Sequence, residues 1–584
     1  MPENDQQNNN ASNASPTYEV KVNGNVVPAE YNLVSIVVYN CINRIAQARF
    51  IFLDGDASKA DFPLSNKPDF LPGSTVEISA GYKGNNQLIF KGMVVKHSIK
   101  LKENKSTFLL VDCRHDAVKA TKTRKNKIFT SQKDSDIFSA ILQPYNITAN
   151  ADDTTVEHKE MVQFNCTDWD FMISRAEANG MFVITDNADL KLSKPNLSAQ
   201  EVMQLKFGNN LLEFDAEMDA RHQFDTVKAT GWDAANQATV EAQGSAPSGF
   251  QQQGNLSVSD LSSKTGDADI NHKTSALITE TELRAWADAQ QLKYSLSKIR
   301  GRAKCQGSDV LKAGVIVDLE GIGDRFNGKT FVSAVRHEIN QGNWLTDVEF
   351  GVSPELFIKE HDVDPLPAEG MLPSVNGLQI GVVSQIENDP LGEDRVLVKL
   401  PLVDGDSDGI WARQALPDAG KNRGSFFRPY PGDEVITGFI NDDPRHAVIL
   451  GMLNSSAKPA VLQPKDTNYE RGLVTDKQMK LWFDDDKLTI QISTSDNNII
   501  QLDDKQKQIS IKDLNGNEIT MSKDGITLKS VKDITLDASS GKAGISAQQF
   551  EASGSTTATV KGSSSAEISS SGSTTVKGTT VMIN

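Results

Sequence analysis

The stretch that decides the fold is residues 380–453, which read IGVVSQIENDPLGEDRVLVKLPLVDGDSDGIWARQALPDAGKNRGSFFRPYPGDEVITGFINDDPRHAVILGML. Short runs of β-branched and aliphatic residues, such as Arg395–Lys399, alternate with turns that contain Gly, Pro and Asp, such as Pro431–Asp433. Runs of this length and spacing predict five or six short strands, which suffice to close a small barrel. We therefore predict a compact all-β domain over residues 374–460.

The chain before this domain has the same β-like texture, with one interruption. Short alternating stretches fill residues 17–115 and resume over 201–373, and each set predicts a β-barrel. Between them, residues 116–200 contain two segments with an acidic cap and apolar residues at helical spacing, Asp134–Leu142 and Asp168–Asn179. This change of period predicts an α/β insertion between the two barrels.

The second barrel region contains two further features. Residues 280–299 carry apolar side chains at helical spacing and form the clearest helix in the sequence. Residues 240–275 are rich in Gln, Ser, Gly and Asp, which predicts a mobile loop.

Residues 461–584 form short alternating pieces that have too few apolar residues for a globular core. The tripeptide Val-Lys-Gly occurs at Val560 and again at Val576, 16 residues later, with Ile568 midway between them. This eight-residue register predicts a strand–turn repeat that places Val560, Ile568 and Val576 on an inner axis. Because so narrow a strip cannot fold alone, we expect it to intertwine with identical copies, which also covers its strand edges.

The last five residues, Thr580–Asn584, form an apolar stretch after a run of small polar residues. Several copies of the strip would gather these side chains into one patch. We therefore expect Val581, Met582, Ile583 and Asn584 to form a docking platform for a capping partner. The alternative is that these residues only complete the core of the strip.

Composition excludes several classes of function. Lys and Arg number 60 and Asp and Glu number 77, so the net charge is −17, which argues against a nucleic-acid or anionic-membrane partner. No run reaches the ~18 apolar residues of a membrane helix. Residues 1–16 are polar, which predicts a disordered tail without a signal peptide. The four cysteines lie far apart, as is typical of a reduced cytoplasmic chain: Cys41, Cys113, Cys166 and Cys305.

Three motifs resemble functional sites. Residues Gly323–Thr330 match the phosphate-binding pattern GxxxxGK[ST], but a strand pattern follows them where that site requires a helix, which favours a hairpin turn. Residues Asp404–Gly409 copy half of a calcium loop between predicted strands and lack the Glu at the twelfth position. A basic stretch from Lys119 to Lys127 indicates a solvated face or a docking site for an acidic partner.

Neither a zinc-protease pattern nor a nucleophile elbow occurs in the sequence. We therefore predict no catalytic residues, no cofactor-binding residues, no metal ligands and no enzymatic activity.

Residues 380–453 resemble the oligonucleotide-binding-fold (OB) domain of the VgrG family, the spike proteins of type VI secretion and related contractile injection systems. The matching pieces are Arg395–Lys399, Trp411–Arg413, Ala419–Lys421, Pro431–Val435, Asp442–Pro444 and Ile449–Gly451. Weaker matches to the hub of the family include Asp170, Phe171, Arg175 and Gly180, then Leu311–Gly314 and Phe326–His337. The C-terminal strip is similar to the trimeric β-helical needle of the family.

The resemblance implies a mainly β fold: a double β-barrel hub over 17–115 and 201–373 with an α/β insertion, an OB-fold collar, and an intertwined trimeric β-helix or β-prism needle over 461–584. It also implies a homotrimer whose partners are a hexameric tube protein, baseplate proteins, a PAAR-type tip cone and effector cargo. Such a spike assembles in the cytoplasm and is then injected or secreted. The sequence leaves open a cell-anchored apparatus or a released particle.

A phage-type tail fibre, or a rod that binds or processes cell-wall carbohydrate, is the alternative. Clustered aromatic residues and paired carboxylates on the repeats would favour it. The predicted needle has few aromatic residues, with Trp482, Phe483 and Phe550 as exceptions, so we prefer the spike.

Overall fold

The computed structural model describes residues 15–103, 106–249, 253–266 and 268–583. The chain divides into two units, an N-terminal unit up to residue 375 that includes 441–443, and a C-terminal unit with the rest. The predicted disordered tail, residues 1–16, lies outside the described residues except for its last two, and the first strand begins at Pro16.

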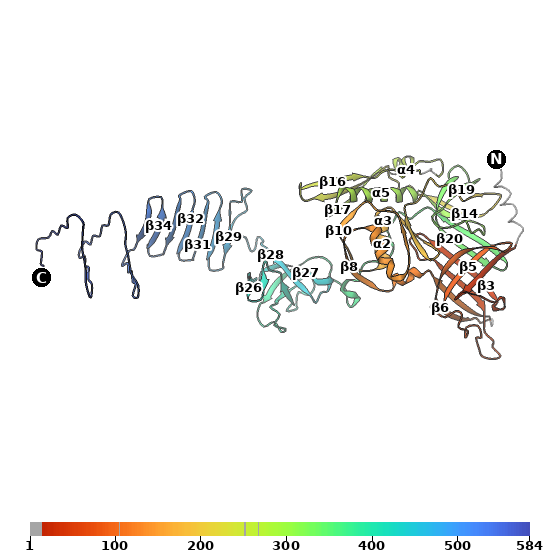
Figure 1. Ribbon diagram of the computed structural model, residues 1–584, viewed down its shortest axis with the longest axis horizontal. Coiled ribbons are helices and arrows are strands. Elements are labelled where there is room, and N and C mark those ends of the chain that lie inside the picture. Colours follow the sequence, from red (N-terminus) through yellow and green to blue (C-terminus); the bar gives the residue numbers. More distant parts are fainter. Residues whose placement is uncertain (1–14, 104–105, 250–252, 267, 584) are drawn as a thin grey trace. The chain divides into compact units, whose positions relative to one another are not determined.

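A thirteen-stranded sheet runs through the N-terminal unit (Figure 1). Along its main path the strands are β14 (Leu211–Met218), β18 (Ile299–Gln306), β21 (Asn343–Phe350), β20 (Gly328–Asn340), β3 (Leu33–Cys41), β4 (Gln47–Leu53), β7 (Thr107–Arg114), β6 (Asn85–Leu101), β5 (Thr75–Tyr82), β1 (Pro16–Val22) and β2 (Asn25–Val26). Off this path, β13 (Met203–Lys206) pairs with β19 (Ile316–Glu320), which pairs with β20. The regions of the two predicted barrels thus share one sheet, joined where β3 pairs with β20.

Each half of this sheet has its own hydrophobic core. The first half buries aromatic and aliphatic side chains such as Phe50 and Ile78, and the second half buries others such as Val335 and Phe350. Trp344 comes from β21 in the second half but belongs to the first core, where its ring stacks on Tyr82 at 5.5 Å. This indole therefore holds the two halves together.

The α/β insertion forms a third core around two helices. Its elements are η2 (Asp116–Thr121), β8 (Arg124–Lys133), α2 (Asp134–Leu142), η3 (Gln143–Tyr145), β9 (Ala149–Ala151), β10 (Glu157–Thr167), α3 (Asp168–Ala178), β11 (Phe182–Asp186) and β12 (Asp189–Ser193). Both helices bury apolar faces that include Phe138 and Met172, as their spacing predicts. Thr167 caps α3 by accepting a hydrogen bond from the Asp170 backbone N–H at 3.0 Å.

The prediction of a mobile loop over residues 240–275 is wrong for the part that the structure describes. This region contains α4 (Val258–Thr265) and most of β17 (Asp269–Leu277), which pairs with β15 (Thr226–Asp233), the partner of β16 (Ala238–Gln243). A capping box starts α4, because Ser257 and Asp260 each accept a backbone N–H from the other, at 3.0 and 2.8 Å. The helix α5 (Glu280–Leu296) lies against this small sheet.

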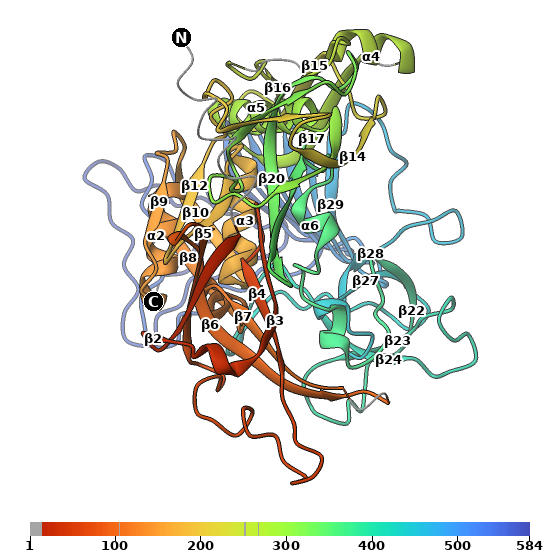
Figure 2. The same ribbon diagram turned by 90° about the vertical axis from the view of Figure 1, so that its right-hand side faces the viewer.

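The C-terminal unit begins with a closed five-stranded barrel (Figure 2). Its strands, in order around the barrel, are β22 (Gln379–Gln385), β23 (Val396–Lys399), β24 (Ile410–Gln414), β28 (Ala447–Met452) and β27 (Glu434–Phe439). Val398, Ala412 and Val435 are fully buried inside it. The barrel confirms the all-β fold expected for the OB collar.

A seven-stranded antiparallel sheet follows the barrel in sequence (Figure 1). The strands pair in sequence order: β29 (Glu470–Val474), β30 (Lys480–Asp484), β31 (Thr489–Ser493), β32 (Ile499–Asp503), β33 (Gln508–Lys512), β34 (Glu518–Ser522) and β35 (Gly525–Lys529). We call this the C-terminal sheet. From residue 530 to the last described residue, 583, the chain contains no strand or helix.

The remaining elements are short: β25 (Ala419–Gly420), β26 (Arg423–Gly424), η1 (Ala29–Tyr31), α6 (Phe357–Glu360), η4 (Pro367–Gly370) and η5 (Ile440–Asp442).

Replacing Trp344 with Ala should destabilise both halves of the thirteen-stranded sheet. The fully buried Trp344 ring comes from a strand of the second half and fills the core of the first half. We expect a loss of about 3–5 kcal/mol in the free energy of unfolding. Hydrogen exchange should show lower protection in β4 and β7 as well as in β18 and β21. The control Trp232→Ala removes a ring that is 40% exposed and should change protection little. Loss confined to β20 and β21 would contradict the shared core.

Candidate functional site

The C-terminal sheet has one apolar face made of two rows of side chains. Residues that pair directly across antiparallel strands lie on the same face, as do residues two apart in a strand. By this rule the first row is Leu473, Leu481, Ile492, Ile500, Ile511, Ile519 and Leu528. The second row is Phe483, Ile490, Leu502, Ile509, Met521 and Ile526. The rows lie side by side along the sheet.

The opposite face of the sheet is mostly polar. Its central row is Trp482, Gln491, Gln501, Ser510, Thr520 and Thr527. The burial is inverted relative to a normal core, because eleven of the thirteen apolar residues are 38–70% exposed whereas Ser510 on the polar face is 7% exposed. A contiguous exposed apolar face of this kind marks an interaction surface.

A hollow of about 490 Å³ lies over the first row. Its apolar walls include Ile492, Ile500, Ile511, Ile519 and Leu528. Covering half-exposed side chains of this size stabilises a complex by roughly 1 kcal/mol each. Over thirteen residues this driving force is large enough to assemble chains.

The residues predicted from the sequence to lie on an inner axis and at the tip are a different set from these two rows. In the single chain Val560, Ile568 and Val576 are 82%, 79% and 70% exposed, so their place on an inner axis stays a prediction. Val581, Met582 and Ile583 are also exposed, and Asn584 lies outside the described residues. The eight-residue repeat did not predict the two apolar rows. Their signal was the alternation inside each five-residue strand, such as Thr489–Ser493.

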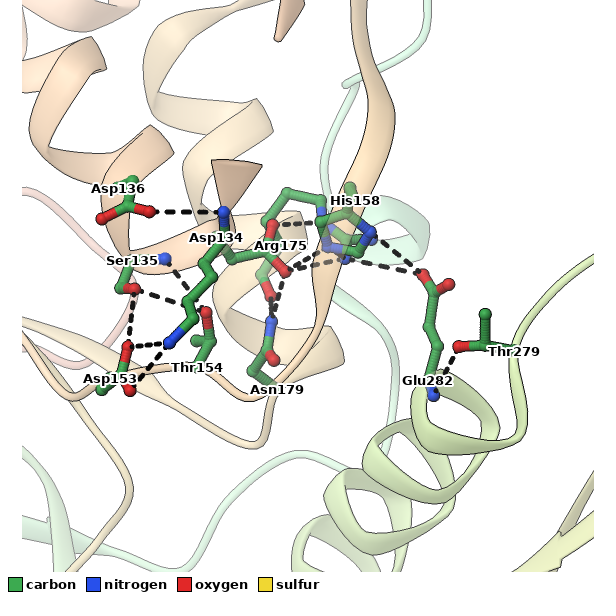
Figure 3. Close-up of polar contacts among 11 residues, drawn as sticks. Asp134, Ser135, Asp136, Asp153, Thr154, His158, Arg175, Asn179, Thr279 and Glu282 are labelled. Atoms are coloured by element: carbon green, nitrogen blue, oxygen red, sulfur yellow. Dashed lines mark hydrogen bonds and ion pairs between the residues drawn. The ribbon is translucent and has the colours of Figure 1, made fainter. Parts of the chain in front are cut away.

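A buried polar cluster joins the insertion to α5 (Figure 3). Arg175 donates two hydrogen bonds to the Asp134 carboxylate, from Nε at 2.8 Å and from Nη2 at 2.9 Å. Asn179 donates a third to the same carboxylate at 2.9 Å, and His158 Nε2 lies 3.0 Å from it. Glu282 of α5 stands 3.9 Å from both Arg175 and His158.

The electrostatics of this cluster favour a structural role. Burial alone would raise the pKa of Asp134, but the hydrogen bonds and positive charge of Arg175 outweigh it and hold that pKa below its ordinary value. Asp134 is therefore a fixed anion that positions Arg175. In the described parts of the chain, no group of three or more His, Cys, Asp or Glu residues is placed to hold a metal.

Two motifs of the sequence analysis lie in turns. Gly323–Thr330 spans the hairpin between β19 and β20, so no helix follows it, as predicted. Asp404–Gly409 is the loop between β23 and β24, flanked by strands.

The basic stretch is largely solvated, as predicted for a solvated face, because Lys122, Arg124 and Lys127 are exposed. Arg124 donates to the backbone carbonyls of Asn165 and Val363, both at 2.7 Å, and Lys125 pairs with Asp168 at 2.5 Å. Arg124 and Lys125 therefore also stabilise the chain internally, and docking of an acidic partner stays a prediction.

Comparison with known families decides the relationship of the N-terminal unit. The model described as the Alg8 N-terminal domain matches residues 12–341, which is more than half of the chain. The chain belongs to the Alg8 N-terminal domain family. The Alg8 N-terminal domain thus covers most of the hub sheet and the whole insertion.

A second family model matches the barrel that follows the Alg8 N-terminal domain. It is described as the type VI secretion system/phage-baseplate injector OB domain and matches residues 379–453. This match confirms the resemblance of the closed barrel to the OB domain of VgrG-type spikes. No curated protein matches the sequence.

Solved structures that match the chain at low identity include tail and secretion proteins. The 43 kDa tail protein of prophage MuSo2 from Shewanella oneidensis shares 13% identity, with 58% of this chain and 99% of that chain covered and a TM-score of 0.44. The E. coli c3393 protein, a type VI secretion component, shares 12%, with 74% and 99% covered and a TM-score of 0.39. A chain of the Francisella PdpA–VgrG complex shares 11%, with 89% and 80% covered and a TM-score of 0.39.

Replacing Leu528 with Asp should disrupt assembly, because the carboxylate would be buried wherever the apolar face is covered by another chain. The matched control is Thr527→Asp, one residue away on the polar face of β35. We expect sedimentation velocity to show smaller species for Leu528→Asp and unchanged species for Thr527→Asp. Equal behaviour of the two variants would contradict the assignment of the apolar face.

Replacing Asp134 with Asn should cost about 3–5 kcal/mol at neutral pH, because it leaves the Arg175 cation buried without its counter-charge. Since folding lowers the pKa of Asp134, this stabilisation is complete above the unfolded pKa of about 3.9 and is lost as pH falls through the folded pKa. Urea unfolding should therefore show a difference in the free energy of unfolding between wild type and Asp134→Asn that is constant between about pH 7 and 5. This difference should become smaller below about pH 4.

The control for this pH series is Asp153→Asn, whose side chain is 77% exposed and pairs with Lys133 at 3.0 Å. We expect the free energy of unfolding of this variant to change by less than about 1 kcal/mol. If the difference in the free energy of unfolding between wild type and Asp134→Asn became larger in acid, the pH dependence would have the opposite sign. That result would contradict the account.

Proposed function

We propose that the chain is the structural spike and hub of a bacterial contractile injection system and that it works as a homotrimer. The observation that supports this most strongly is the two-row apolar face of the C-terminal sheet. A single layer of five-residue strands has no second layer to bury that face, so other chains must cover it. Three copies would enclose the apolar rows in a prism with the polar faces in water.

The hub would match a partner that has sixfold symmetry. Each chain carries two halves of the shared sheet, each with its own core, so three chains would present six such halves. A hexameric tube protein could therefore stack on the trimer without a mismatch of symmetry. Baseplate proteins would contact the outside of the same hub.

The segment after β35 would continue the needle toward its tip. Val560, Ile568 and Val576 would meet their copies on the axis, since all three are apolar and exposed in the single chain. Val581, Met582 and Ile583 would then form the apolar patch that docks a PAAR-type cone, with cargo carried through the cone.

The role we propose is mechanical and not enzymatic. A narrow rod must transmit axial load, and strand pairing between chains along its length resists buckling without a wide core. The polar cluster around Asp134 serves the hub structurally in this view. Assembly in the cytoplasm followed by export with the particle fits a chain in which no described helix is long and apolar enough to cross a bilayer.

Deleting residues 581–584 should abolish co-purification of the tip cone and leave the trimer intact, because the assembly face lies upstream in β29–β35. The matched control replaces Lys577, a polar neighbour of Val576, with Asp and should retain the cone. Binding of the cone to the truncated chain with unchanged affinity would show that these residues only complete the needle core.

A further inference from the structure

A small pocket lies beside the polar cluster that joins the insertion to α5 (Figure 3 shows the cluster). Its volume is about 240 Å³. The apolar part of the wall comes from Val156, Ile278, Ala285 and Trp286, and Arg175 and Glu282 contribute charge. Neither the spike function nor the family matches assigns a role to this pocket.

Two carboxylates line the pocket, and Glu282 is the one with the weaker compensation. Arg175 is neutralised by its two parallel hydrogen bonds to Asp134. Glu282 stands 3.9 Å from Arg175 Nη2 and from His158 Nδ1, which is beyond hydrogen-bonding distance. In the part of the chain that the structure describes, no donor lies within hydrogen-bonding distance of this carboxylate, which is 27% exposed. The pocket therefore favours a cation or a strong donor.

The indole of Trp286 adds a second preference of the same sign. Trp286 follows Glu282 by one helical turn on α5, so both side chains lie on one face of the helix. The His272 ring lies 5.5 Å from the indole ring. An aromatic face next to a carboxylate attracts cations, and more strongly when the cation is desolvated.

The volume of the pocket indicates which kind of group can bind in it. Sites for whole small molecules usually measure about 300–1,000 Å³, and this pocket is smaller. It suits one long side chain with an aliphatic stem and a charged end. We propose that the pocket receives a lysine or arginine side chain of a partner protein, with the stem against Trp286 and the charged head at Glu282.

Disulfide tethering tests the charge preference directly. In an Ala285→Cys variant of the full chain, the new thiol lines the pocket and can exchange with cystamine, which leaves a cationic arm, or with hydroxyethyl disulfide, which leaves a neutral arm of similar length. We expect the cationic adduct to be favoured about tenfold at equilibrium, as measured by peptide mass spectrometry. Thr274→Cys, another lining residue, repeats the test if Ala285→Cys folds poorly.

Two further substitutions identify the group responsible. Adding Glu282→Gln should reduce the preference to within about twofold. Adding Glu280→Gln, an acid of the same helical turn that is paired with Arg284 at 3.2 Å, should leave it unchanged. Equal or reversed preference in the parent variant, or a preference that survives Glu282→Gln, would overturn the proposal.

Competition by small amines distinguishes two possible occupants of the pocket, a protein side chain and a free polyamine. Nα-acetyl-lysine amide and Nα-acetyl-arginine amide should each reduce the cationic adduct at least as well as putrescine at the same concentration. Clearly stronger competition by putrescine would assign the pocket to a free amine and would contradict a protein partner.

Discussion

The exposed apolar face of the C-terminal sheet is the feature that requires this protein to associate with other chains. Thirteen aliphatic or aromatic side chains line one face of seven short strands, and the single chain supplies no second layer to cover them. A sheet of this kind is unstable in water by itself, because its buried surface is small and its edges are open. The association with identical chains that we propose would remove both defects at once, so the proposed needle would form only in the assembly.

The hub has the opposite character. Its sheet halves and its insertion each enclose a core, so the N-terminal unit has the means to fold within one chain. Trp344 and the pairing of β3 with β20 make the two halves one continuous piece. Under the proposed function, the N-terminal unit could fold first and the C-terminal sheet could then assemble with its copies. This order would shorten the time for which the apolar rows are exposed during synthesis.

The elements that were predicted correctly are those with strong local signals. The barrel of residues 379–452 follows from alternating strands and Gly and Pro turns, and α2 and α3 follow from caps and helical spacing. The region of α4 was missed because its helix buries little and depends on a capping box inside a polar stretch, between Ser257 and Asp260.

Other features depend on contacts that sequence spacing does not reveal. Arg124 binds the carbonyl of Val363, 239 residues away, so this internal contact of the basic stretch could not be recognised from the sequence. The two apolar rows required the strand register, since each strand contributes only two or three apolar residues. The polar cluster brings Asp134, Arg175 and Glu282 from three separate helices to one point.

Counting the chains in the particle tests the central claim most directly. Native mass spectrometry of the full chain at micromolar concentration should give a complex of three copies of the 63.6 kDa chain. A folded particle with the mass of one chain would show that the apolar face of the C-terminal sheet does not drive assembly, and it would contradict the account.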